Sequence, residues 1–275
     1  MRKKLSVKVL EYICLSLIMI IQIIPLVTVF LNSLSTASTL TNHLIDFSFN
    51  FHFENYPHVW GKGHYLISYR NSLIIGVGTT LLVVIVDSLA AYSVTKLKPY
   101  CKGIFLGYLF VSVSIPSFTF LVPTYFIFTK LGLVNTYFGL ILIIAAMQIP
   151  FNLLLLQSFF LGIPNELQES AKIDGCNEFQ TLFYIIRPLA KPIITTVSLL
   201  TFVASWNDFL FSNTFMQSDN LRTVAVRFYL FSGRYSTDYA AIYSAAAITI
   251  LPIIIIYLIL QKSFIEGMVT GSIKG

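Results

Sequence analysis

The chain alternates between long apolar segments and shorter polar ones, and this alternation predicts a bundle of membrane-crossing helices. An α-helix needs about 20 consecutive, mostly apolar residues to cross the hydrocarbon core of a bilayer. Six segments meet this requirement, each with at most one charged residue: residues 13–31, 71–95, 103–128, 137–160, 193–211 and 241–260. The third of them is interrupted by Pro116 and Pro123.

The polar connection after the first span has a different periodicity. Residues 46–54 alternate strictly between phenylalanine and other residues, and this period of two predicts an extended strand on an apolar surface. The same connection holds all four histidines: His43, His52, His58 and His64. Their spacing is irregular and no cysteine accompanies them, so we interpret them as solvated residues at the membrane interface rather than metal ligands.

The long polar stretch between the fourth and fifth spans, residues 163–192, predicts two short helices joined by a turn. Pro164 begins the first helix, and Gly175 can end it because glycine accepts the left-handed conformation of a helix cap. A second, amphipathic run follows, before Pro188 and Pro192 end it and begin the next element. Its apolar positions are Phe179, Leu182, Phe183 and Ile186. Such a loop forms a rigid protrusion at a membrane surface, which a soluble partner can contact.

Composition excludes a soluble domain. Hydrophobic residues make up 56% of the chain and charged residues 11%, with a mean hydropathy of +0.78, whereas soluble domains are about 25% charged. The net charge of +6 is read as a signal of membrane orientation rather than of nucleic-acid binding. Twelve of the 18 Lys and Arg residues fall on the side that holds both termini and residues 163–192, which predicts that this side is cytoplasmic.

Polar side chains inside the spans are the candidates for a substrate path, because each unpaired polar group in a bilayer costs several kcal/mol. These candidates are Gln148, Asn152, Trp206, Asn207 and Asp208. Gln148 and Asn152 share a helix face, where they can line a path or bond to a neighbouring helix. Trp206 with its two polar neighbours can stack on and hydrogen-bond a sugar, or serve as a structural residue of the aromatic belt.

No catalytic motif accompanies these residues. The chain has no Gly-x-x-x-x-Gly-Lys-Ser/Thr loop for ATP, no Gly-x-Ser-x-Gly, no His-Glu-x-x-His and no paired catalytic carboxylates. Asp87 is an acid inside the second span, which by default marks function. An ion-coupled secondary carrier that uses Asp87 is therefore the alternative to the interpretation below, although we find no internal repeat of the kind that such carriers often show.

The stretch 163–192 also carries a spaced motif: Glu169-Ser170-Ala171, three residues, Gly175, nine residues, Ile185, one residue and Arg187-Pro188. This motif resembles the EAA loop of ABC importer permeases, which reads Glu-Ala-Ala, three, Gly, nine, Ile, one, Leu-Pro. The chain departs from that pattern at Ser170, Cys176 and Arg187, where alanine, alanine and leucine are usual. Arg187 leaves the packing of the second short helix open.

Further motifs extend the resemblance from about residue 53 to the C-terminus, to the carbohydrate branch of these permeases and its maltose-type second permease subunits. They are Asn71-Ser72-Leu73, Leu89-Ala90-Ala91-Tyr92, residues 131–137, residues 206–210 and residues 271–275. The resemblance implies an all-α integral membrane protein with the six transmembrane helices of the type I ABC importer permease fold. It divides the chain into a first helix with an outer segment (1–69), a transmembrane core (70–262) and a cytoplasmic tail (263–275).

The function that the resemblance implies is that of a permease subunit in an ATP-driven importer of a di- or oligosaccharide. The subunit would form half of the translocation path and couple to a cytoplasmic ATPase through its loop. The coupling residues would be Glu169, Ala171, Asp174, Gly175 and Phe179.

The implied partners are a second, different permease, an ATPase dimer, an extracellular or periplasmic solute-binding protein and membrane lipid, but no nucleic acid. ATP and Mg²⁺ would be bound by the ATPase, which leaves this chain with no cofactor and no catalysis of its own. The expected location is a bacterial cell membrane, with both termini in the cytoplasm.

Overall fold

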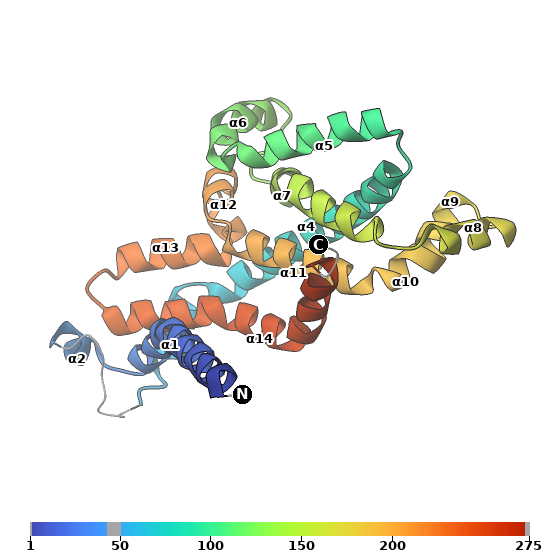
Figure 1. Cartoon of the computed structure of the whole chain (residues 1–275). Helices are drawn as coiled ribbons and strands as arrows, with labels where there is room; N and C mark the ends of the chain where they lie inside the picture. Colours follow the sequence, from blue (N-terminus) through green and yellow to red (C-terminus); the bar gives the residue numbers. More distant parts are fainter. Residues whose placement is uncertain (1, 43–50, 273–275) are drawn as a thin grey trace. The chain divides into compact units, whose positions relative to one another are not determined.

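The computed structural model describes residues 2–42 and 51–272, which are almost entirely helical and contain no strand (Figure 1). The helices are α1 (Arg2–Ser33), α2 (Ala37–Asn42), α3 (Asn55–Lys62), α4 (Tyr65–Thr95), α5 (Pro99–Ser114), η1 (Ser117–Phe120), α6 (Leu121–Lys130), α7 (Tyr137–Phe160), α8 (Asn165–Ile173), α9 (Glu178–Thr181), η2 (Leu182–Ile186), α10 (Arg187–Leu189), α11 (Lys191–Asn207), α12 (Leu210–Phe215), η3 (Asp219–Leu221), α13 (Val224–Arg234) and α14 (Tyr239–Ser272). The all-α fold predicted from the apolar segments is confirmed.

Four of these helices contain stretches that are long and apolar enough to cross a membrane by themselves: Val7–Ser33, Tyr65–Thr95, Tyr137–Phe160 and Tyr239–Lys262. Two further candidates are bent pairs, α5 with η1 and α6 at an angle of 91°, and α9 to α10 with α11 at 83°. The described chain therefore has four candidate spans, or up to six if each bent pair counts as one. All six predicted apolar segments correspond to one of these helices or pairs.

The chain folds into two compact units. The first comprises residues 1–65 and 227–252, and the second comprises residues 66–226 and 253–275. In the first unit, the end of α1 is tied to the start of α3, because Asn55 donates hydrogen bonds to the carbonyls of Ser33 and Ser35 at 3.0 and 2.9 Å. Ser244 of α14 donates a further bond to the Ser33 carbonyl, at 2.8 Å.

The predicted strand at residues 46–54 is not found in the part that the structure describes. Residues 43–50, which include His43, lie outside the described residues. Phe51 and His52 have no regular structure, and Phe53 and Glu54 form a turn that leads into α3. Residues 51–54 therefore form no strand, whereas the strand at residues 46–50 stays a prediction.

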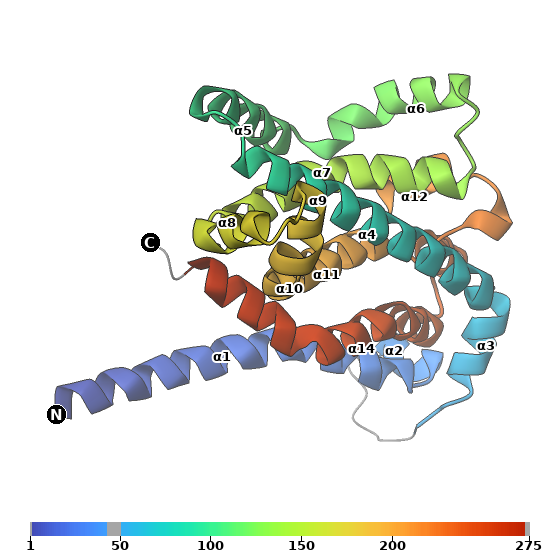
Figure 2. The same cartoon turned by 90° about the vertical axis from the view of Figure 1, so that its right-hand side faces the viewer.

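The core of the second unit lies between α4, α7 and α11. Buried side chains of the three helices, among them Val83, Leu156 and Val197, pack with Leu182 and Ile186 of η2 in one hydrophobic cluster. In Figures 1 and 2, α8 and α9 lie beyond the C-terminal end of α7, at the same end of this unit as the C-terminal end of α4. The polar stretch is therefore mounted on the ends of the core helices.

Of the two prolines that were predicted to interrupt the third span, only Pro116 does so. Proline disfavours the helical conformation of the residue before it, and Ile115 is extended, with φ −83° and ψ 123°. The chain turns there between α5 and η1. Pro123 is the third residue of α6, which follows η1 directly, and the helix continues past it to Lys130.

The ends of the last two predicted spans also differ from the prediction. The fifth was expected to continue to residue 211, but α11 ends at Asn207 and α12 begins at Leu210. The carboxylate of Asp208 accepts hydrogen bonds from the backbone N–H and the hydroxyl of Ser212, at 2.7 and 2.8 Å, and this favours a new helix start over a continued one. The predicted tail after residue 260 is helical as far as Ser272.

Candidate functional site

The polar loop forms the helix, turn and second helix that its sequence predicts. The first helix, α8, begins after Pro164 and ends at Ile173. Gly175 has φ +84°, the left-handed conformation expected of a glycine cap. The N–H of Cys176 reaches back to the Ala171 carbonyl at 2.9 Å, which satisfies one of the free carbonyls at the end of α8.

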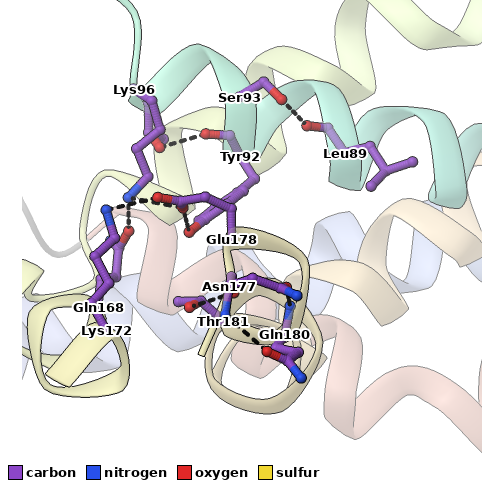
Figure 3. Close-up of polar contacts among 11 residues, drawn as sticks. Leu89, Tyr92, Ser93, Lys96, Gln168, Lys172, Asn177, Glu178, Gln180 and Thr181 are labelled. Atoms are coloured by element: carbon purple, nitrogen blue, oxygen red, sulfur yellow. Dashed lines mark hydrogen bonds and ion pairs between the residues drawn. The ribbon is translucent and has the colours of Figure 1, made fainter. Parts of the chain in front are cut away.

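The second helix of the loop starts at a reciprocal cap. The Asn177 side chain accepts a hydrogen bond from the Gln180 N–H, and the Gln180 side chain accepts one from the Asn177 N–H, both at 2.8 Å (Figure 3). The helix then widens into one π-helical turn, η2, and continues through Pro188 to Leu189. Pro188 does not end the helix as predicted, because the wide turn before it accommodates a ring that clashes in a regular α-helix. Pro192 stands in the first turn of α11, as predicted.

Two side chains near the end of α4 hold this loop. The Tyr92 hydroxyl donates a hydrogen bond of 2.6 Å to the Glu178 carboxylate, and the Lys96 ammonium donates one to the side-chain oxygen of Gln168 (Figure 3). The Lys172 ammonium lies 2.7 Å from the other oxygen of Glu178, and that of Lys96 lies 3.8 Å from the carboxylate. One acidic side chain on α9 therefore joins both loop helices to α4.

The hydrogen bonds from Lys172 and Tyr92 lower the pKa of Glu178 below its usual value of 4.5. The carboxylate is consequently ionised at neutral pH, where it can accept both bonds. Its side chain is 53% exposed, and pairs of this kind contribute about 0.2–1 kcal/mol each. The contacts therefore set the position of the loop more than they stabilise the fold.

Sequence reasoning did not identify Tyr92 and Lys96 as part of this site. Tyr92 was noted only as the end of the Leu-Ala-Ala-Tyr motif, and Lys96 only as a charge that marks a loop. The available signal was their spacing of four residues at the end of a span, which places both on one helix face.

The five predicted coupling residues occupy different positions on the loop. Ala171 is buried in the interior of the second unit. The other four are exposed: Glu169, Asp174, Gly175 and Phe179. Ile173, at the end of α8, is 87% exposed, an unusual state for an isoleucine that stands next to the turn. The end of the loop thus presents apolar and acidic side chains together, a surface that a protein partner can cover.

The aromatic candidate for sugar stacking is enclosed in this conformation. Trp206 is only 1% exposed and packs between Tyr69 and Phe202, with ring centroids at 5.6 and 5.8 Å. Asn207 is exposed, and the carboxylate of Asp208 accepts two hydrogen bonds from Ser212 in the first turn of α12. The three residues therefore do not form one sugar-binding surface here, and their place on the path stays a prediction.

The other pair of path candidates is divided between the interior and the surface. Asn152 is fully buried and donates a hydrogen bond of 3.1 Å to the Thr201 hydroxyl of α11, the helix-to-helix contact that was one of its two interpretations. Gln148, one turn earlier, is half-buried. A cavity of about 460 Å³ lies between α5, η1 and α7 near Pro116 and Pro150, but none of the five path candidates is among its lining residues.

Asp87 is fully buried in α4, and among the side chains that the structure describes neither of its carboxylate oxygens has a hydrogen-bond partner. The described residues also hold no group of three His, Cys, Asp or Glu side chains suited to a metal ion. His52 instead pairs with Glu54 at 2.6 Å.

Several apolar spans and one polar loop anchored to α4, with an exposed end, are features of an all-α integral membrane protein. Comparison with known proteins gives the family. Residues 85–269 match binding-protein-dependent transport system inner membrane components, and the chain belongs to this family. Its members are transporter permeases and not catalytic enzymes.

Two curated relatives cover most of the chain. The first, named probable ABC transporter permease protein YurM, from Bacillus subtilis, is 35% identical over 91% of this chain and 83% of its own length. The second, the trehalose/maltose transport system permease protein MalG of Thermococcus litoralis, is 32% identical over the full length of both. A chain from the crystal structure of a bacterial ABC transporter that imports alginate has the same fold, with a TM-score of 0.81, 22% identity and coverage of 96% of this chain and 98% of that one.

Proposed function

We propose that this protein is one permease subunit of an ATP-driven importer of a di- or oligosaccharide. The loop at residues 163–192 is the observation that carries the proposal, because its EAA-type motif stands on an anchored, protruding helix pair. Membership of the transport family supports the same function. The class of substrate is supported by the carbohydrate-type motifs and by the relative named for trehalose and maltose.

The proposed mechanism is alternating access, driven by soluble ATPases on the cytoplasmic side of the membrane. A dimer of ATPases would close on ATP and move the end of the loop that holds Asp174, Gly175 and Phe179. The loop is bonded to α4 through Glu178 and is continuous with α11 through α10. A displacement of the loop would therefore reach two core helices, and no covalent bond in this chain needs to be made or broken.

The other partners follow from the same proposal. A second, different permease would supply the other half of the path, and a solute-binding protein on the outer side would deliver the sugar. Both termini and the loop would be cytoplasmic, as the distribution of Lys and Arg indicates. Gln148, Asn152 and the residues at 206–208 remain the proposed path positions, which become accessible when the helices move.

Purification of the complex tests the proposal directly. We expect a tagged form of this chain, extracted in mild detergent, to bring with it an ATPase and a second permease. Asp174→Lys and Gly175→Arg should leave the chain in the membrane but remove the ATPase, or uncouple its ATP hydrolysis from sugar uptake. Lys98→Glu is the control, because it reverses an exposed charge in the neighbouring connection between α4 and α5. Normal substrate-stimulated hydrolysis in both loop variants would rule out the coupling role.

The secondary-carrier alternative is not favoured by the family. A carrier that uses Asp87 would lose uptake in Asp87→Asn, and its uptake would collapse when a protonophore removes the ion gradient at constant ATP. We expect neither result.

A further inference from the structure

The second unit has an apolar groove where the loop meets the outer surface of α4. The groove has a volume of about 430 Å³ and is lined along α4 by Leu81, Ile85 and Leu89, and opposite them by Phe183 and by Ile194 of α11. This volume lies within the range of about 300–1,000 Å³ of small-molecule sites. The three α4 side chains are exposed, so the groove is open to whatever surrounds this unit.

Arg187 is the one charged residue in the lining of this groove. It stands where the EAA pattern has leucine, and it does not pack inward as a leucine would. Its side chain is exposed, with the guanidinium carbon 5.5 Å from the centre of the Phe183 ring. Among the side chains that the structure describes, no carboxylate forms an ion pair with it. Its planar fork of N–H donors therefore remains available to an anion.

Arg187 and the apolar lining belong to elements that form or adjoin two candidate spans. Arg187 is the first residue of α10, near the end of the loop, and α11 begins four residues later at Lys191. The lining from Leu89 to Leu81 extends about 12 Å along α4 towards the middle of its apolar span, at 1.5 Å per residue. Arg187 therefore precedes the apolar part of α11, and the groove that it lines extends along the apolar segment of α4.

We propose that this groove binds one anionic phospholipid, with its phosphate on Arg187 and an acyl chain between α4 and η2. Basic side chains between helices at a membrane surface are suited to such headgroups. A purely apolar partner helix fits less well, because it would cover the guanidinium without supplying a counter-charge. The lipid would lie against both α4 and the loop, where it supports their contact.

Native mass spectrometry of the full complex from nanodiscs tests this proposal. The nanodiscs contain phosphatidylcholine with or without phosphatidylglycerol, and the measurement counts the lipids that remain bound. We expect one phosphatidylglycerol to be retained in preference to phosphatidylcholine. Arg187→Gln should reduce this preference about fivefold, since one cation contributes roughly that much to anionic-lipid binding. Arg187→Lys should keep most of it, and Lys98→Gln, which removes an exposed cation outside the groove, should change nothing.

A second variant tests the apolar part of the groove. Ser88 lies in the lining of the groove and is half-buried, so Ser88→Phe fills the groove while Arg187 is kept. We expect this variant to lose the retained phosphatidylglycerol, with an unchanged yield of complex.

Several results would overturn the proposal. Equal retention of phosphatidylglycerol in wild type and Arg187→Gln would do so, and so would equal retention of the two lipids. Release of the bound phosphatidylglycerol by inorganic phosphate would indicate a simple anion site instead. A photoreactive residue placed at Phe183 that crosslinks to another protein chain of the complex would show that a protein, and not a lipid, covers the groove.

Discussion

The Tyr92 hydroxyl and the Glu178 carboxylate lie 2.6 Å apart, although 86 positions separate the two residues in the chain. Tyr92 is buried near the end of α4, and Glu178 is the first residue of α9. This bond joins a core helix of the second unit to the loop that carries the EAA-type motif. Movement of the loop therefore cannot leave α4 unaffected unless the bond breaks.

Tyr92→Phe removes this bond and leaves the buried ring in place. We expect the chain to assemble normally, while α9 opens more often and sugar uptake falls relative to ATP hydrolysis. The contribution of the bond is about 1 kcal/mol, which corresponds to a roughly fivefold change in local opening. Hydrogen exchange of residues 175–182 measures the opening. Tyr100→Phe, at an exposed tyrosine of α5, is the matched control. Unchanged exchange in Tyr92→Phe would show that the bond does not hold the loop.

The lowered pKa of Glu178 predicts how the attachment of the loop depends on pH. The folded-state pKa lies below the ordinary value of 4.5, so the bonds contribute fully above about pH 4.5 and are lost as the pH falls through the folded value. We expect the same protection of residues 175–182 at about pH 7 and about pH 5.5, after correction for intrinsic exchange, and a loss of protection below about pH 4.5. Glu178→Gln should remove this dependence. A loss of protection that begins at about pH 6 would point to a different group.

The backbone at Gly175 predicts a difference between two substitutions. A side chain at this position would meet no atom within 4 Å. The effect of a substitution on the stability of the turn therefore comes from the positive φ alone. Gly175→Val should destabilise the turn by about 1–2 kcal/mol, because a branched side chain disfavours the left-handed conformation. Gly175→Asn should be much milder, since asparagine tolerates that conformation. The affinity of the ATPase for the purified permease measures the effect of each substitution. Equal effects of Val and Asn would show that space for the partner, and not the backbone, requires glycine.

Asp208 gives a test that separates capping from a role in the sugar path. Asp208→Leu removes the acceptor for Ser212 and should destabilise α12 by about 1 kcal/mol, the usual effect of losing a cap. Asp208→Asn keeps an acceptor and should retain the stability. If Asp208 acts only as a cap, uptake by Asp208→Asn stays near normal. If both variants are stable but transport poorly, the carboxylate belongs to the path. Thermal unfolding and uptake in vesicles, measured side by side, distinguish the two.

Local patterns were enough to predict much of this protein. Long apolar segments can hide their backbone polar groups only as helices, so the spans followed from length and hydropathy alone. The turn at Gly175 and the break near Pro116 followed from the conformations that glycine allows and proline forbids. These properties belong to one residue and its neighbours, and they do not depend on the rest of the chain.

Contacts between distant segments could be decided only by the tertiary structure. Trp206 was a candidate for stacking on a sugar, yet it is enclosed by Tyr69 from another helix. The bond from Tyr92 to Glu178 depends on how α4 and the loop pack. Such pairings leave no periodic signal in one sequence, because many partners of similar polarity and size satisfy the same local pattern.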